Sequence, residues 1–192
     1  AGLGPQHPYP QDSGTGIGTR LITLTHCTRL DNSQLDALTL LLQDVVHGGA
    51  SVGFLAPLSH QDAMTYWQGV AGELGPLLHC WLAERDGQLL GTVQLSRCGK
   101  ANGRHRGEIQ KLMVHSRARG QGIARLLMQE AETAAWAAGC STLVLDTDSE
   151  SVAAKLYPKL GWVHAGDIPD FAASPDGRLH TTRYFYKLLA PR

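Results

Sequence analysis

The chain has 192 residues, of which 43% are hydrophobic, and its 17 basic side chains balance 17 acidic ones. This length and composition are typical of one α/β domain with a core of ordinary size. The balanced charge gives no reason to expect nucleic acid or an anionic membrane as a partner. The sequence has no apolar run of about 18 residues or more and no signal-peptide pattern at its start, so we expect a cytoplasmic protein.

The four cysteines, Cys27, Cys80, Cys98 and Cys140, form no C-x-x-C pair and have no histidine nearby at a metal-binding spacing. Each lies in or beside an apolar segment, where a free cysteine behaves as a small hydrophobe. We therefore expect reduced thiols in the core, and neither disulfides nor a zinc site or other metal site.

The first 19 residues are rich in Gly and Pro and nearly free of aliphatic side chains. They predict a flexible tail over residues 1–19, followed by a single domain over residues 20–192. The domain begins at residues 20–25, where apolar and polar side chains alternate as in a half-buried strand.

Two helices and a hairpin are expected next. Residues 31–33 offer N-caps for a first helix, in which leucines recur at helical spacing until Gly48 ends it. Ser59 and Asp62 form a capping-box pattern before a second helix. The hairpin is predicted by the Asp86-Gly87 turn between strands at residues 77–84 and 89–96.

The remaining elements alternate between strands and helices. A polar loop at residues 98–107 leads into a strand at 108–114, and an amphipathic helix over 123–138 ends at Gly139. The last predicted elements are a buried strand, a short helix and two further strands, at residues 142–146, 149–160, 162–165 and 184–188.

The resulting order is β-α-α-β-β-β-α-β-α-β-β. The central strand-helix-strand passage implies one parallel pair of strands, and the hairpins imply that the rest of the sheet is antiparallel. We therefore predict a mixed α/β fold, with about seven strands in one sheet and four helices on both faces.

The stretch Glu108–Glu130 (EIQKLMVHSRARGQGIARLLMQE) carries the chemical signal. A strand runs through a glycine-containing loop directly into a helix, whose first turn has free backbone N–H groups and the positive end of the helix dipole. Glycine lets an anion approach the backbone, and arginines add positive charge, so the segment predicts a phosphate or pyrophosphate site. It matches neither a Walker loop nor a dinucleotide fingerprint, and an ordinary helix start with surface arginines is the alternative.

Three segments carry a resemblance that favours the phosphate site. Arg119-Gly120-Gln121-Gly122-Ile123-Ala124 resembles the R-x-x-G-x-G/A signature of the GNAT acetyltransferase superfamily, and it follows the strand end Leu112-Met113-Val114 as that signature does. Residues 154–162 (AKLYPKLGW) resemble the A-x-x-F-Y-x-x-x-G-F segment of the family. The resemblance covers roughly residues 20–189 and implies the GNAT fold and acetyl transfer from acetyl-CoA to an amine.

A closer similarity is to the tabtoxin-resistance acetyltransferases, which acetylate the amine of an amino acid toxin. It rests on VHGGASVGF, EIQKLMV, LDT and SPDGRLH, at residues 46–54, 108–114, 145–147 and 174–180. This similarity implies a resistance or detoxification role. Many relatives carry Asn at the position of Ser151, which is a departure from the family pattern.

The resemblance also assigns the acetyl-CoA site. It implies that the pyrophosphate binds the loop formed by Arg119, Gly120, Gln121, Gly122, Ile123, Ala124 and Arg125. It also implies that Leu112 and Val114 pair with the pantetheine amides as a neighbouring strand would, and that a backbone N–H near Leu112 or Met113 polarises the thioester carbonyl.

Glu108 and Asp146 are the candidate bases, because an alkylammonium must lose a proton before it attacks. Strand alternation predicts that Glu108 shares a face with Gln110 and Leu112, and Asp146 ends the neighbouring strand. One carboxylate would take the proton and the other would bind the ammonium. Alternatively, Glu108 pairs with loop arginines and Asp146 caps the last helix.

Tyr157 resembles the family tyrosine that protonates the leaving thiolate, although the next residue, Pro158, is expected to disturb the helix. Its alternative is a packed aromatic residue with a satisfied hydroxyl. His47 and Ser51, between the first two helices, and His180, after the Asp176-Gly177-Arg178 turn, are the candidate contacts for the substrate, or else structural residues.

The predicted function is therefore acetyl transfer to a primary amine of a small molecule, such as a toxin or antibiotic. Aminoglycosides, polyamines and protein N-termini remain alternative acceptors, and a CoA-binding module without catalysis is the alternative function. Such a module would need none of Glu108, Asp146 and Tyr157. Many GNAT proteins are dimers, and the last strands could pair across an interface as a homodimer.

Overall fold

The computed structural model describes residues 21–190, so the predicted tail at residues 1–19 lies outside the described part of the chain. One sheet contains seven strands, in the order β1-β2-β3-β4-β5-β7-β6. The strands are β1 (Thr23–Cys27), β2 (Leu78–Arg85), β3 (Gln88–Arg97), β4 (Arg106–Val114), β5 (Thr142–Asp148), β6 (Val163–Ala173) and β7 (Leu179–Leu188). The helices are α1 (Asn32–His47), α2 (His60–Glu73), α3 (Ile123–Ala137) and α4 (Val152–Lys159).

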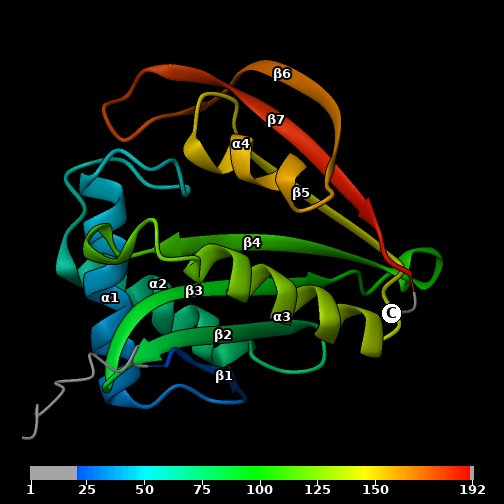
Figure 1. Cartoon of the computed structure of the whole chain (residues 1–192). Coiled ribbons are helices and arrows are strands. Elements are labelled where there is room, and N and C mark those ends of the chain that lie inside the picture. The colour runs from blue at the N-terminus through cyan, green and yellow to red at the C-terminus, as the bar shows by residue number, and fades with distance from the viewer. Residues whose placement is uncertain (1–20, 191–192) are drawn as a thin grey trace, which may run out of the picture.

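The helices cover both faces of the sheet, so the predicted mixed α/β fold is confirmed (Figure 1). The α3 face buries Trp81, Leu127 and Phe185 in one hydrophobic cluster that also contains Tyr157 of α4. The α1–α2 face buries a second cluster, which includes Leu38 and Trp67. Among the residues described here, no helix is long and apolar enough to cross a membrane.

Local sequence signals fix the helix ends. Asp31 caps α1 and forms a reciprocal capping box with Gln34, and the Ser59 side chain accepts a hydrogen bond from the Asp62 amide at the start of α2. Helix α4 begins after Ser151, which accepts from the Ala154 amide. It is therefore shorter than the predicted helix over residues 149–160.

Only one pair of neighbouring strands is parallel, as predicted, and its pairing is short. Strand β4 pairs with β5 at three positions, the last of which joins Glu108 to Val144. Beyond this position the two strands separate, whereas β5 remains paired with β7 over its full length, from Thr142 to Asp148 (Figure 1). The sheet is therefore split between the carboxyl-terminal halves of β4 and β5.

A β-bulge in β4 corrects the predicted alternation. Gln110 pairs with Gln94 and Met113 pairs with Thr92, so Lys111 and Leu112 together oppose a single residue of β3, and Lys111 has φ 53°. An extra residue moves all later side chains to the opposite face. Leu112 therefore packs against the α3 cluster, and the prediction that it shares a face with Glu108 and Gln110 was wrong.

The last two strands are much longer than the predicted strands at residues 162–165 and 184–188. Strand β6 forms the edge of the sheet, and most of its side chains are exposed on both faces. Such a strand lacks the apolar alternation by which strands are recognised in a sequence. The predicted turn at Asp176-Gly177-Arg178 does connect β6 to β7, and Gly177 has φ 89°.

Glu132 of α3 ties the helix to the carboxyl-terminal strands. Its side chain is 4% exposed and accepts hydrogen bonds from Trp162 Nε1 at 2.9 Å and from Lys187 Nζ at 2.8 Å. Lys187 Nζ also donates to the Leu160 carbonyl at 2.6 Å. The buried pair therefore joins the last helix turn of α4, the helix α3 and strand β7.

We expect Glu132→Gln to lower the free energy of unfolding by about 3 kcal/mol, because it removes the buried ion pair with Lys187. Trp162→Phe should also lower it, by about 1 to 3 kcal/mol, because it removes one hydrogen bond to Glu132 and part of a ring that is 3% exposed, while the ion pair stays in place. Urea denaturation followed by far-UV circular dichroism would measure both values. A loss of less than about 1 kcal/mol in Glu132→Gln would contradict the importance of the ion pair.

Candidate active site

The loop between β4 and α3 has the backbone that an anion site requires. Gly120 and Gly122 have φ 73° and 79°, the left-handed region that glycine adopts without strain. A Cβ at either glycine would meet no atom within 4 Å, so the backbone is open on that side. Gly122 is the N-cap of α3, and no side chain caps the helix there.

Positive potential accumulates at the same place. No described residue accepts a hydrogen bond from the backbone N–H groups of residues 120–125, which lie at the positive end of the α3 dipole. Arg119 and Arg125 are exposed beside them, whereas the Gln121 side chain accepts a hydrogen bond from Arg85 at 2.8 Å. Unpaired amides, open glycines and arginines together fit a pyrophosphate group.

Asp44 of α1 anchors this loop. Its two carboxylate oxygens accept hydrogen bonds from the Ser116 amide and hydroxyl, both at 2.8 Å. Burial alone would raise the pKa of Asp44, but the two bonds from Ser116 and the charges of His115 and Arg119 lower it overall. The aspartate therefore stays ionised and holds the loop against the carboxyl-terminal end of α1.

The split in the sheet leaves one edge of β4 without a strand beside it. Residues 109–114 pair with β3 on one side and have no ladder partner on the β5 side. Leu112, Met113 and Val114, the predicted pantetheine contacts, lie in this stretch and lead directly to the glycine loop. An extended molecule can bind such an edge by backbone hydrogen bonds, as an added strand does.

Glu108 and Asp146 lie on opposite sides of the split and on the same face of the sheet. Glu108 is the last β4 residue paired with β5, and Asp146 lies two residues beyond its partner Val144. Burial and, second, the nearby charge of Asp146 raise the pKa of Glu108, while Lys111 partly opposes them. The structure thus brings together the two carboxylates singled out in the sequence.

The structural alternatives for these carboxylates do not match their contacts. The N-cap of α4 is Ser151, so Asp146 does not cap the last helix. Asp146 instead accepts a hydrogen bond from Thr182 at 2.7 Å. No arginine of the described chain lies within 4.0 Å of the Glu108 carboxylate as an ion-pair partner.

Tyr157 lies beside the split, on the α3 side. Its ring is buried against Trp162 and Phe185, and Pro158 lies in the last turn of α4, so the helix is complete up to Tyr157. Burial and then the charge of Asp146 raise the pKa of the Tyr157 phenol. The hydroxyl is therefore held in its neutral form, which can donate a proton.

The three predicted substrate contacts do not lie together. Ser51 Oγ and His180 Nε2 are hydrogen-bonded at 2.7 Å, which connects the α1–α2 loop to β7. A second link joins the Ala56 amide to the Pro175 carbonyl at 2.9 Å. His47 lies apart from them, where its Nε2 accepts a hydrogen bond from the Leu58 amide and holds the loop to α1.

Sequence reasoning missed Lys111. Its Nζ lies 5.9 Å from the centroid of the Tyr66 ring and near Gly53 of the α1–α2 loop. Burial lowers the pKa of Lys111, while the charges of Asp146 and Glu108 act in the opposite direction. The available signal was a lysine in the middle of the otherwise mostly apolar strand that ends in the glycine loop.

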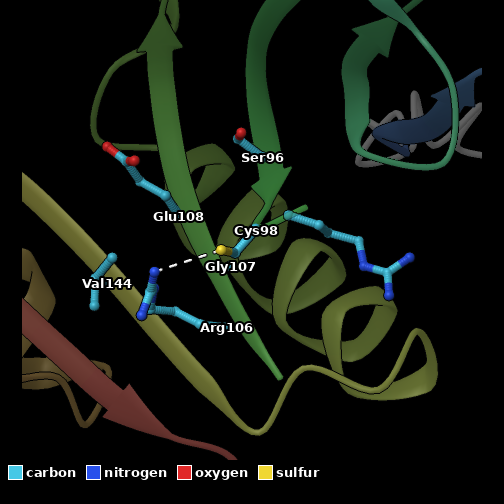
Figure 2. A pocket seen from close by; sticks show the side chains of 7 residues that line it. Ser96, Cys98, Arg106, Gly107, Glu108 and Val144 are labelled. Carbon is cyan, nitrogen blue, oxygen red and sulfur yellow. Dashed lines mark hydrogen bonds between the residues drawn. The ribbon is translucent and has the colours of Figure 1, made fainter. Parts of the chain in front are cut away.

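A pocket of about 220 Å³ adjoins Glu108 at the closed end of the split (Figure 2). Arg106 lies on its wall, and its Nη2 donates to Cys98 Sγ at 3.4 Å. The lining residues are Ser96, Arg97, Cys98, Arg106, Gly107, Glu108 and Val144. The described residues contain no group of three or more His, Cys, Asp or Glu side chains that could hold a metal ion.

A model of the acetyltransferase (GNAT) family matches residues 47–162, which is more than half of the chain. The chain belongs to the GNAT acetyltransferase family. It is therefore an N-acetyltransferase by family, and the matched segment contains the glycine loop, both carboxylates and Tyr157.

Solved structures share the fold. The ribosomal-protein-alanine N-acetyltransferase from Brucella melitensis has a TM-score of 0.70 at 20% identity, covering 87% of this chain and 99% of that one. An N-acetyltransferase from Staphylococcus aureus has a TM-score of 0.71 at 20% identity, covering 86% and 98%. YncA from Salmonella typhimurium, whose structure contains its cofactor acetyl-CoA, has a TM-score of 0.69 at 17% identity, covering 88% and 96%. These likenesses confirm the predicted GNAT fold.

Gly122→Val tests the glycine loop. A β-branched residue is strained at φ 79°, and its methyl groups would fill the open space beside the amides at the start of α3. We expect CoA to bind at least about tenfold more weakly, a loss of about 1.4 kcal/mol. Isothermal titration calorimetry with CoA would measure the change.

Gly139→Val is the matched control. Gly139 has φ 90°, follows the other end of α3 and would also meet no atom within 4 Å. The same strain is introduced there, so this variant should lose stability and retain its affinity for CoA. Unchanged CoA affinity in the Gly122→Val variant would contradict the assignment of the glycine loop as the pyrophosphate site.

Proposed function

We propose that the protein transfers the acetyl group of acetyl-CoA to a primary amine of a small molecule. The observation that carries this proposal is the position of Glu108 and Asp146, which face each other across the split beside the unpaired edge of β4. A carboxylate pair at this point can receive an ammonium group, and the free strand edge leads to a loop that fits a pyrophosphate.

The donor would bind along β4. The amides of residues 121–124 and the guanidinium groups of Arg119 and Arg125 would hold the pyrophosphate, and the edge at Leu112 and Val114 would pair with the pantetheine amides. The donor supplies an activated thioester. A backbone N–H near Leu112 or Met113 would donate to the thioester oxygen as negative charge develops there.

The carboxylates would prepare the acceptor. A simple alkylammonium is almost fully protonated at neutral pH, so its nitrogen cannot attack until a base removes a proton. Glu108 would accept this proton, directly or through water, and its raised pKa makes it a stronger base than an ordinary glutamate. Asp146, held by Thr182, would attract the ammonium.

Tyr157 would complete the transfer. The amine nitrogen forms a bond with the acetyl carbon and then loses its second proton, and the carbon–sulfur bond breaks as the phenol donates its proton to the departing sulfur. The proton released by the nitrogen restores the phenol. The neutral form of Tyr157 that burial favours is the form that can do this.

The α1–α2 loop and the β6–β7 hairpin favour a small acceptor. The Ser51–His180 and Ala56–Pro175 hydrogen bonds connect the two segments, so together they form a continuous wall on the side proposed for the acceptor. Such a wall suits a free small molecule better than the end of a folded protein. Together with the similarity to tabtoxin-resistance enzymes, it supports acetylation of an amine-containing toxin or antibiotic.

The proposal extends to the cellular setting and the assembly. Cys27, Cys80 and Cys140 are free and buried, as expected for a cytoplasmic protein. Edge strand β6 exposes Ile168 and Phe171, at 44% and 46% of their surface, and would pair with its copy in a homodimer.

Thiol release from acetyl-CoA, measured against amino acid toxins, aminoglycosides, polyamines and N-terminal peptides, tests the activity. We expect release with a small amine, and Glu108→Gln should lower kcat by about 100-fold or more while CoA affinity stays unchanged. If none of these acceptors supported thiol release, the proposed activity would be contradicted. An unchanged pH–rate profile in the variant would remove Glu108 as the base.

Asp146→Asn provides a separate test through pH. Glu108 acts as a carboxylate, so the rate should fall as the pH drops through its pKa. Because the Asp146 charge helps to raise that pKa, the variant should move the acid limb of the kcat/KM profile to lower pH. A shift to higher pH would contradict the proposed coupling.

Sedimentation equilibrium tests the assembly. The wild-type chain is expected to be a dimer, and Ile168→Lys with Phe171→Glu should be monomeric, since charges on the exposed edge strand oppose pairing. A wild-type monomer at micromolar concentration would contradict the homodimer.

A further inference from the structure

Lys111 is a partly buried charged residue beside the split between β4 and β5, and the proposed reaction does not use it. Among the described residues, only Asp86, Lys111 and Asp170 are non-glycine residues with positive φ. Asp86 forms the β2–β3 turn, and Asp170 lies in the irregular middle of β6. Lysine seldom adopts this conformation, so a lysine at the β4 bulge requires a reason.

The bulge determines where the lysine lies. In regular alternation residue 111 would face opposite to Gln110, toward the α3 cluster. Instead, Lys111 Nζ reaches the α1–α2 side, near Tyr66 and Gly53, while Ile109 and Leu112 pack toward α3. The backbone conformation therefore directs the Lys111 cation to the α1–α2 face of the sheet, the face on which Glu108 also lies.

This cation has no close counter-ion. No carboxylate of residues 21–190 lies within the 4.0 Å ion-pair distance of Lys111, although the charges of Asp146 and Glu108 influence it. The adjacent wall, residues 48–59 (GGASVGFLAPLS), has no acidic side chain. A partly buried lysine is ordinarily paired, so its partner is expected to come from outside the chain.

The region around the split thus carries charges of both signs. Glu108 and Asp146 supply negative charge across the split from each other, and Lys111 supplies positive charge toward the α1–α2 loop. A diamine or an aminoglycoside offers only cations and would leave Lys111 facing like charge. A zwitterion offers a cation and an anion at a short separation. Its cation matches the Glu108 and Asp146 carboxylates, and its anion matches Lys111.

We infer that Lys111 binds the carboxylate of the acceptor, so that the substrates are free amino acids whose ammonium group lies at Glu108 and Asp146. This inference rests on the proposed acetyl transfer and specifies its substrate class. Lys111 then acts in substrate binding: its ammonium donates to the carboxylate and takes no part in the bond changes at the acetyl group.

Matched acceptors that differ only in the carboxylate test the inference. L-methionine is compared with 3-(methylthio)propylamine and with L-methioninamide, and L-lysine with cadaverine. In the wild-type protein, kcat/KM should be about 10- to 100-fold higher for each amino acid, as expected for one charge-assisted contact. Equal values within each pair would overturn the inference.

Three variants locate the effect. Lys111→Met should remove the preference for the amino acids by raising their KM about 10- to 100-fold relative to the matched amines. The lost charge also raises the Glu108 pKa, so the acid limb should move to higher pH for amino acids and amines alike. Lys111→Arg, which keeps the positive charge, should retain part of the preference for the amino acids. Lys100→Met, at an exposed lysine before β4, should change nothing. A thermal-shift measurement confirms that each variant is folded.

Equal losses for amino acids and amines in Lys111→Met would overturn the inference and show that Lys111 acts only through Glu108. Calorimetry of the same acceptors with the CoA-bound protein separates this result from failure of the proposed function. Carboxylate-dependent binding that Lys111→Met abolishes supports the inference even without thiol release. Absence of such binding and of release would overturn both proposals.

Discussion

The three-residue pairing of β4 with β5 is the constraint on which the site depends. The strands can approach at Gly107 because it has no side chain: a Cβ there would lie 2.9 Å from Leu95 Cδ1 and 3.1 Å from Leu143 Cδ2. Beyond Glu108, β5 keeps its antiparallel ladder with β7, and the bulge in β4 increases the local twist. The two strands therefore separate, and each carries one carboxylate along its side of the split.

The crossover helix α3 converts this split into a two-sided site. It starts at the open end of β4 and returns to the start of β5, so its amino-terminal amides lie where the strand edge is free. The features that we propose for the donor, which are the glycine loop, the free edge and Tyr157, belong to the α3 side. The features that we propose for the acceptor, which are Glu108, Lys111 and the Ser51–His180 contact, belong to the α1–α2 side. The split is the passage between them.

The parts of the fold that sequence analysis predicted are those with local causes. Asp31 and Ser59 indicate the starts of two helices, and the Asp86-Gly87 turn indicates a hairpin. The order of the strands in the sheet is enough to bring Glu108 near Asp146. The length of β6 had no local signal, because an edge strand exposed on both faces needs no apolar alternation. The Ser51–His180 bond joins residues 129 positions apart, and nothing in either segment specifies that distance.

The bulge at Lys111 could not be predicted for a different reason, and it shows how one residue couples both halves of the site. Lysine has no preference for left-handed backbone, so its sequence context favoured a regular strand. The extra residue nevertheless turns Leu112 and Val114 into the α3 core, which fixes the free β4 edge, and directs Lys111 to the acceptor side. Removing the bulge would reverse both orientations at once. The orientation of the β4 edge proposed for the donor and that of the lysine proposed for the acceptor therefore both depend on the bulge, where Lys111 has φ 53°.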